Sequence, residues 1–467
     1  MKQRPLVRLL LIFLGLALLV ALPSLLAGRR DLAQARAATD PLRASAQYEQ
    51  AAGRMPWRAD LLEQAAQNAL AGADPREAAR LFAEALDRNA LSPAGLVSYG
   101  DALWVLSQPD AGLAQWQRAE AADPQNAALH KRLAAAYELR GEYNAAREAL
   151  DQAVALDPGD ARSQHRLALL LAASRPEASL AHFERAEQLD PSLEPRISPL
   201  VEAINKALRE ASPAAQLTEA GRALSAAGEL RLSEQALQAA LELDPQSAGA
   251  WALLGQVRES LGEDGLPDLQ KALELAPRDP QVQIMLGLFW LRRGDEMQGL
   301  PHFAAAAALA PQDPLTQVAY ADALARTGDL AEAYAAYQRA VALAPEDADY
   351  WRLLANFSVD YAYDVDHTGL SAALKAQAFA PNDYETLITL GRVSLAQGKF
   401  DTAERFFTRA LNADPALPAA PLYLAIVALE QGHRDLARQY VDHVLLIDPA
   451  GPYGGRARLL LERYFSK

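Results

Sequence analysis

A proline recurs along this chain at an interval close to 34 residues. The prolines stand at positions 124, 158, 191, 245, 277, 311, 345, 381, 415 and 449, and all but one of the gaps are 32 to 36 residues long. Proline has no backbone N–H and disrupts a helix interior. A proline at a fixed period in a chain rich in Ala and Leu therefore predicts an array of short helical units, not one globular core.

Other positions keep step with the proline. In the segment GDLAEAYAAYQRAVALAP (328–345), small Ala333, bulky Tyr337 and Ala340 stand twelve, eight and five residues before Pro345. The equivalent positions of the other units carry Ala, Gly or Ser, then a bulky residue, then Ala. Spacings of four and three place these residues on one helix face, which predicts close packing against a neighbouring helix.

A second helix precedes this one in each unit. It is visible as WALLG at 251–255, IMLG at 284–287 and LITLG at 387–391. Glycines at 141, 228, 262, 294, 328, 398 and 432 are expected to form the turn between the two helices. This 34-residue order resembles the tetratricopeptide repeat (TPR) over about residues 40 to 449. The resemblance implies an all-α fold, a right-handed α-solenoid of about eleven helix-turn-helix units.

Two segments depart from the period. The gap between Pro191 and Pro245 holds 20 extra residues, and Leu200, Ile204 and Leu208 have helical spacing there. We therefore expect an amino-terminal array over 27–191, an extra helix or joint over 192–213, and a carboxy-terminal array over 214–449. The first unit is expected to keep only its second helix, residues 450–467 to form a capping helix, and residues 357–369 to form a long connection.

The amino terminus carries a basic tail (1–5) and an apolar run of 21 residues (6–26), long enough to cross a bilayer. We expect a retained transmembrane anchor. The alternative is a secretory signal cleaved after Ala27, although that site lacks the usual small residue two places earlier. The predicted location is a single-pass protein of a bacterial inner membrane with an extracytoplasmic body. Cleavage would instead give a periplasmic or secreted protein.

Charge and composition exclude several classes of function. The net charge is -14, and because the first thirty residues contribute +5, the remainder carries -19. Such a balance argues against a nucleic-acid-binding surface. The chain has no cysteine, so thiolate metal sites and cysteine nucleophiles are excluded. No cofactor is expected.

Catalytic motifs are also missing from the sequence. It contains no glycine-rich phosphate loop, H-E-x-x-H, G-x-S-x-G or EF-hand pattern. The loop acids Asp360, Asp364 and Asp366 with His367 raise the question of a metal, but such acids are common in turns. We therefore expect no enzyme activity and no metal site.

TPR-like arrays bind partners mostly along the face formed by the first helices. Carrying over the inward positions of the family gives Lys131, Arg132, Arg162, His165 and Arg166, a basic cluster in an otherwise acidic chain. Such a cluster suits a carboxylate or an acidic peptide, and the simpler interpretation is a solvated face paired with nearby Glu. Further candidates are Trp104 and the smaller set Arg352, Asn356 and Arg392.

The predicted function is a membrane-tethered scaffold or assembly factor that binds protein or peptide partners along the groove of the solenoid. The alternative in the same layout is an extracytoplasmic chaperone associated with the translocon or with envelope biogenesis. The alternative of another class is an enzyme or an accessory subunit of a glycosyltransferase complex.

Overall fold

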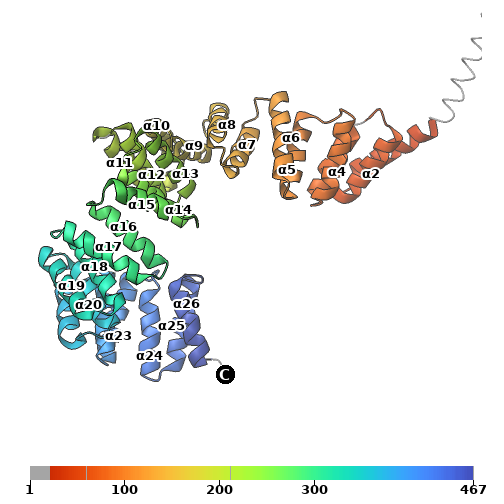
Figure 1. The fold of residues 1–467 in the computed structure, drawn as a ribbon. Helices are drawn as coiled ribbons and strands as arrows, with labels where there is room; N and C mark the ends of the chain where they lie inside the picture. Colours follow the sequence, from red (N-terminus) through yellow and green to blue (C-terminus); the bar gives the residue numbers. More distant parts are fainter. Residues whose placement is uncertain (1–21, 59, 211, 466–467) are drawn as a thin grey trace, which may run out of the picture. The chain divides into compact units, whose positions relative to one another are not determined.

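The fold of this chain consists of helices. The computed structural model describes residues 22–58, 60–210 and 212–465, and no strand occurs in these ranges. The chain divides into two compact units, Met1–Ala239 and Ala240–Lys467, shown by sequence colour in Figure 1. The prediction of an all-α repeat fold is confirmed.

The first unit holds a helix over 22–37 followed by paired helices and one extra helix. Their bounds are α2 (Pro41–Arg54), α3 (Asp60–Ala71), α4 (Pro75–Asp87), α5 (Pro93–Val105), α6 (Pro109–Ala122), α7 (Ala127–Leu139), α8 (Tyr143–Leu156), α9 (Ala161–Ala172), α10 (Pro176–Leu189), η1 (Pro191–Leu193), α11 (Glu194–Glu210), α12 (Pro213–Ala226) and α13 (Leu230–Leu243), which crosses into the second unit.

The second unit continues the same pairing and ends on a single helix. Its elements are α14 (Ala248–Ser260), α15 (Leu266–Leu275), α16 (Pro280–Arg292), α17 (Glu296–Leu309), α18 (Pro314–Thr327), α19 (Leu330–Leu343), α20 (Ala348–Asp360), η2 (Val365–Gly369), α21 (Leu370–Phe379), α22 (Tyr384–Ala396), α23 (Phe400–Ala413), α24 (Ala419–Glu430), α25 (Arg434–Ile447) and α26 (Pro452–Phe465).

Local sequence signals set the helix ends. In α18, the side chain of Asp313 accepts a hydrogen bond from the backbone N–H of Leu315, and Pro314 occupies the first turn, where its missing N–H costs nothing. The helix ends at Gly328, whose φ of 92° is left-handed. The other six predicted turn glycines also have positive φ, so the prediction for this turn is confirmed in every unit that has the glycine.

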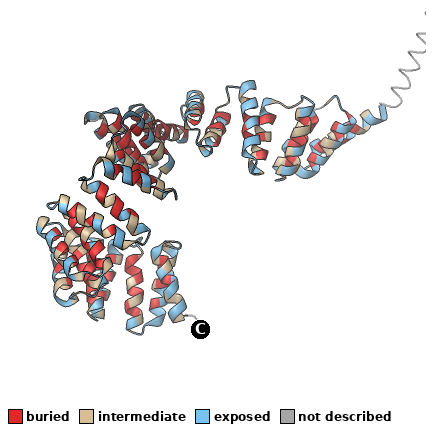
Figure 2. Cartoon of the chain, in the orientation of Figure 1, coloured by how far each residue is buried: buried red, intermediate tan, exposed pale blue. Residues whose placement is uncertain are grey.

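The core follows the small and bulky positions predicted in the second helices. The bulky residues Phe82, Phe183, Leu237 and Phe407 are fully buried, as is Ala340. Figure 2 shows the buried residues along the faces where helices meet. Small residues let the two helices of a unit approach closely, and a Cβ on Gly112 would lie 3.0 Å from the carbonyl oxygen of Gly100.

In several units, a side chain of the first helix donates a hydrogen bond to the unit-closing proline six residues earlier, in the turn after the preceding helix. Each of these side chains carries an N–H and donates it to the proline carbonyl oxygen. The pairs are His130 with Pro124, Gln164 with Pro158, Trp251 with Pro245, Gln283 with Pro277, and Trp351 with Pro345, at 2.8 to 3.3 Å. Each proline lies two residues beyond the last helical residue, so these bonds, here called the proline caps, satisfy a turn carbonyl and tie the turn to the next helix.

The extra helix α11 lies inside the first unit. It packs against α10 and α12, and Leu200 and Ile204 are buried. An extra helix or a joint was expected over 192–213, and α11 is a helix in that segment. The boundary between the two compact units falls at Ala239 and Ala240.

The first repeat of the array also differs from expectation, because it has a first helix in addition to the expected second helix. The helix over 22–37 packs against α2: Ala35 is buried in the same cluster as Tyr48, and Asp31 forms an ion pair with Arg54. Most of the predicted span 6–26 lies outside the described residues. Within the described residues, no helix is long and apolar enough to cross a membrane.

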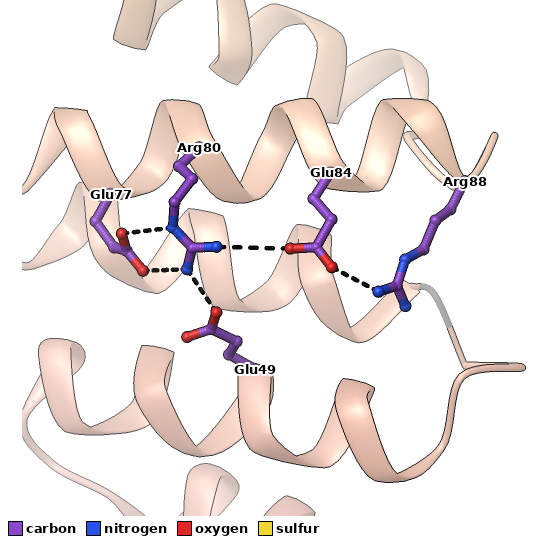
Figure 3. A network of polar contacts seen from close by, with 5 residues as sticks. All are labelled: Glu49, Glu77, Arg80, Glu84 and Arg88. Carbon is purple, nitrogen blue, oxygen red and sulfur yellow. Dashed lines mark hydrogen bonds and ion pairs between the residues drawn. The ribbon is translucent and has the colours of Figure 1, made fainter.

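An ion-pair network joins the second helices α2 and α4 (Figure 3). Arg80 of α4 contacts Glu49 of α2 at 2.5 Å, together with Glu77 and Glu84 of its own helix, and Glu84 also contacts Arg88. The side chains are roughly 36 to 49% exposed, so water and salt screen these contacts and they stabilise the pair of helices only weakly.

Candidate functional site

The predicted basic residues of α7 and α9 lie on neighbouring first helices and form ion pairs. Lys131 Nζ lies 2.8 Å from Asp160 at the start of α9, and this hydrogen bond raises the pKa of Lys131. Arg132 Nε and Nη2 donate to the two carboxylate oxygens of Asp101 in α5. Two of the predicted cations therefore link α7 to α9 and to α5.

Arg166 extends this series of ion pairs. Its Nε donates to Glu138 of α7 at 2.8 Å, and its Nη1 donates to Glu229, between α12 and α13, at 2.8 Å. The side chain is 33% exposed. Lys131, Arg132 and Arg166 thus each have a carboxylate partner, and a ligand that uses them must share or displace these acids. Their role in binding an acidic partner stays a prediction.

His165 and Arg162 complete the predicted cluster. The half-buried ring of His165 lies with its centroid 6.1 Å from that of Phe183, and burial lowers its pKa. Arg162 is exposed at the start of α9. All five predicted residues therefore belong to α7 and α9, but their chemical surroundings differ.

A pocket of the first unit adjoins this cluster. It has a volume of about 670 Å³ and lies among α9, α11 and α12. His165 is the one member of the cluster that lines it. The extra helix forms one wall, so this hollow has no counterpart in a regular repeat.

The lining of this pocket combines apolar and charged groups. The apolar part includes Leu169 of α9, Leu200 and Ala203 of α11, and Ala223 of α12. Arg196, Arg222, Glu219 and Glu229 supply the charges. Arg222 pairs with Glu219 at 3.3 Å, and Glu229 is held by Arg166. Such a lining suits a segment with an apolar side chain and a polar flank.

Two prolines of α11 modify the same wall. Pro195 and Pro199 both line the pocket. Because Pro199 has no N–H, the carbonyl of Pro195 lacks the helical donor that would normally reach it from four residues further on.

Trp104 lies at a second, smaller hollow of about 400 Å³ between α5, α6 and α7. Its ring is half-buried, with its centroid 5.1 Å from that of Trp116, and it shares the hollow with Leu113 and Leu139. Leu139 is 76% exposed. Trp104 thus packs partly in the core and also lines an open hollow.

The second predicted set, Arg352, Asn356 and Arg392, comes together in the second unit. Arg392 of α22 donates to Asn356 Oδ1 of α20 at 2.7 Å and pairs with Asp360. Arg352 pairs with Asp349 at 3.0 Å and approaches Glu385 at 3.7 Å. As in the first unit, the cations of consecutive first helices are paired with acids.

The acidic loop of the second unit is held by its own side chains. His367 Nδ1 lies 2.9 Å from Asp364 Oδ1, and Asp364 also accepts a hydrogen bond from the hydroxyl of Thr368.

A separate hydrogen-bonded pair lies in the same unit. Tyr337 donates a hydrogen bond to Asp322, and burial raises the pKa of the Asp322 carboxyl. The described residues contain no group of three or more metal-type ligands that could hold an ion.

Sequence reasoning missed the pocket and the proline caps. The caps share only an N–H donor six residues after the proline, a signal visible in the sequence once Trp, His and Gln are treated as equivalent donors. The pocket depends on how α11 packs between α10 and α12, and the residue pattern of one helix cannot show that.

Comparison with protein families identifies the repeat. Three models, each described as tetratricopeptide repeat, match residues 63–194 in three overlapping stretches, 218–265, 314–357 and 373–459. Together they cover more than half of the chain. The chain is therefore a tetratricopeptide-repeat protein, and this fold is consistent with a protein-protein interaction scaffold.

Solved structures show similar repeats at low similarity. Yeast Tom70 is 14% identical, with a TM-score of 0.43, 87% of this chain and 96% of that chain covered. The Cut9–Hcn1 hetero-tetramer of APC/C is 16% identical, with a TM-score of 0.42 and coverages of 94% and 95%. YrrB, described as a TPR protein with an unusual peptide-binding site, is 18% identical, with a TM-score of 0.29 and coverages of 41% and 98%. These values are too low to assign a partner. Comparison with curated proteins found no match.

Proposed function

We propose that this protein is a membrane-tethered scaffold that binds a protein or peptide segment at the first-helix face of its first unit. The pocket among α9, α11 and α12 carries this proposal, because an inserted helix adds to a regular array a hollow of about 670 Å³ with apolar walls and charged edges. The role is binding rather than catalysis, and the expected partner is neither a nucleic acid nor a cofactor.

A variant that fills the pocket tests the binding role. Ala226 lies exposed at the end of α12 and lines the pocket, so Ala226→Phe should occupy the hollow without entering the core. We expect full-length protein in detergent to recover a set of partners that the variant loses. The matched control is Ala111→Phe, at an exposed position of α6. Recovery of the same partners by the filled variant would contradict the proposal.

The proposed tether is the apolar run 6–26, retained as an anchor. Support comes from the helix over 22–37, because the alternative cleavage site after Ala27 falls inside it, directly before Gly28. A Cβ on Gly28 would lie 2.9 Å from Met55, so Gly28 packs closely against the end of α2. Cleavage would remove Leu25, which packs against the buried cluster that contains Ala35 and Tyr48.

Intact mass measurement of the protein from membranes distinguishes the two outcomes. We expect the full-length mass and resistance to carbonate extraction, whereas a chain that begins at Gly28 would refute the anchor. For the proposed extracytoplasmic body, protease added outside spheroplasts should digest the carboxy-terminal unit. Protection of that unit would place it in the cytoplasm.

A further inference from the structure

The amino-terminal end of the first unit carries an exposed basic and apolar surface. Leu22, Leu26, Arg29 and Arg30 follow one another at helical spacing on one face of the helix 22–37, and all four are exposed. The opposite face carries Gly28, Asp31 and Ala35, which are buried. The exposed face is thus not needed for packing within the repeat.

The turn after α2 brings an exposed tryptophan to the same end of the helix. Ser24 Oγ donates to the carbonyl oxygen of Arg54 at 3.4 Å. The turn that follows is closed by the N–H of Arg58 donating to the carbonyl oxygen of Met55 at 2.8 Å. Trp57 lies in this turn and is 62% exposed. Because α2 returns antiparallel to the helix 22–37, Trp57 lies at the level of residues 24–28.

This end of the protein is positive, although the chain as a whole is strongly negative. Residues 22–58 contain six arginines against three acidic residues. Arg54 pairs with Asp31, and Arg58 pairs with Asp60 at 2.8 Å. For Arg29 and Arg30, no carboxylate lies within ion-pair distance in the described chain. Their charges are therefore available to a ligand outside the protein.

We propose that Trp57, Leu22, Leu26, Arg29 and Arg30 form a contact surface for anionic phospholipid headgroups. This inference rests on the proposed tether, since the apolar run 6–26 ends at this surface and would bring it to the bilayer. Tryptophan favours the membrane-water interface, where its apolar ring and its N–H are both satisfied. Arginine pairs with lipid phosphates and adds electrostatic attraction to anionic lipids. The contact would fix the orientation of the first repeat at the membrane.

Because the chain has no cysteine, one introduced cysteine can report on this surface without background. The probe is full-length Trp57→Cys carrying an environment-sensitive fluorophore, reconstituted in vesicles of phosphatidylcholine with or without phosphatidylglycerol. A nitroxide on the lipid headgroup serves as quencher. We expect loss of fluorescence that is larger with phosphatidylglycerol and smaller when Arg29→Glu and Arg30→Glu are added. The control charge changes are Arg76→Glu and Arg278→Glu, at exposed positions elsewhere, and the control probe is Leu139→Cys.

Vesicle flotation in carbonate, measured on the same samples, separates this inference from the proposed tether. Chain that floats but shows no quenching at position 57 overturns the lipid contact and leaves the tether intact. Quenching that is equal in both lipids and unaffected by the glutamates reports only nearness to the bilayer and also overturns it. A third outcome is a chain that does not float with the vesicles in carbonate, although anionic vesicles quench its fluorescence when carbonate is absent. This outcome refutes the anchor and supports the lipid contact.

Discussion

The turn between the two helices of a repeat needs a residue with a left-handed backbone (positive φ), and this need recurs along the chain. Seven units meet it with glycine, whereas the corresponding turns before α4, α6 and η2 use Ala73 (φ 59°), Ser107 (φ 60°) and Ala362 (φ 50°). A side chain in this region strains the backbone by roughly 1–2 kcal/mol, and glycine does not. Those three turns therefore hold a local cost that the units with a glycine avoid.

Ala73→Gly should stabilise the protein. Relief of the backbone strain exceeds the extra entropy that glycine adds to the unfolded chain, roughly 0.4–1 kcal/mol, and the expected gain in the free energy of unfolding is therefore on the order of 1 kcal/mol. The same change at Ala114, exposed inside α6, should cost about 1 kcal/mol. Denaturant unfolding of both variants measures whether each change raises or lowers the free energy of unfolding. A loss of stability in Ala73→Gly would show that the turn is not strained.

His302 predicts a pH dependence of stability. Gln283 donates to the carbonyl oxygen of Pro277 at 3.1 Å, so its Oε1 accepts from His302 Nδ1 at 2.8 Å. Burial lowers the pKa of His302 below its ordinary value of 6.5. The unfolded chain therefore binds a proton more readily than the folded chain. The contribution of the neutral His302 ring to the free energy of unfolding is present above pH 6.5 and is lost as the pH falls below 6.5.

The measurement is the free energy of unfolding of His302→Asn at several pH values. The variant should lose less stability than the parent protein as the pH falls below 6.5, because its side chain does not titrate. His433→Asn, at an exposed position, is the control and should follow the parent curve. Parallel curves for His302→Asn and the parent would contradict the assignment.

Pairs of helices within a unit depend on small residues where they cross. Gly265 and Gly255 bring α15 and α14 so close that a Cβ on Gly265 would lie far inside contact distance of the Gly255 carbonyl. Backbone cannot move aside as a flexible side chain can, so the helices themselves would have to separate.

Gly265→Ala should therefore destabilise the second unit, by about 1–3 kcal/mol or more. Gly249→Ala is the matched change, because nothing lies within 4 Å of its added Cβ, and inside α14 alanine should be neutral or stabilising by up to about 1 kcal/mol. Thermal unfolding of the two variants compares these outcomes. Equal midpoints would mean that the helices separate at no cost.

In the molecule as a whole, stability should spread between neighbouring repeats and fade with distance. Each repeat of an array contacts mainly its neighbours, so a local defect loosens adjacent helices first. Gly391→Ala in α22 would press a Cβ into the ring of Phe407. We expect faster amide hydrogen exchange in α20 to α24 and unchanged exchange in α16. Gly455→Ala, with open space at its Cβ, should leave both regions unchanged. Uniform acceleration throughout the second unit would show that it opens as one cooperative block.

The candidate site could be predicted only in part. The inward positions of the repeat grouped Lys131, Arg132 and Arg166, which lie on the neighbouring helices α7 and α9, and their role in binding stays a prediction. Their carboxylate partners Asp101 and Glu229 lie 31 and 63 residues away in sequence. Which acid reaches which cation depends on how successive units stack, and the repeat period does not specify that stacking.

The order of amino acids alone specified the repeat, the helix pairs, the turn glycines and the buried small and bulky positions, because each of these depends on contacts within one unit of 34 residues. Packing between units decided the rest. It placed α11 as one wall of the pocket and paired the inward cations with acids of other units. These features depend on contacts between residues distant in sequence, and no local pattern encodes them.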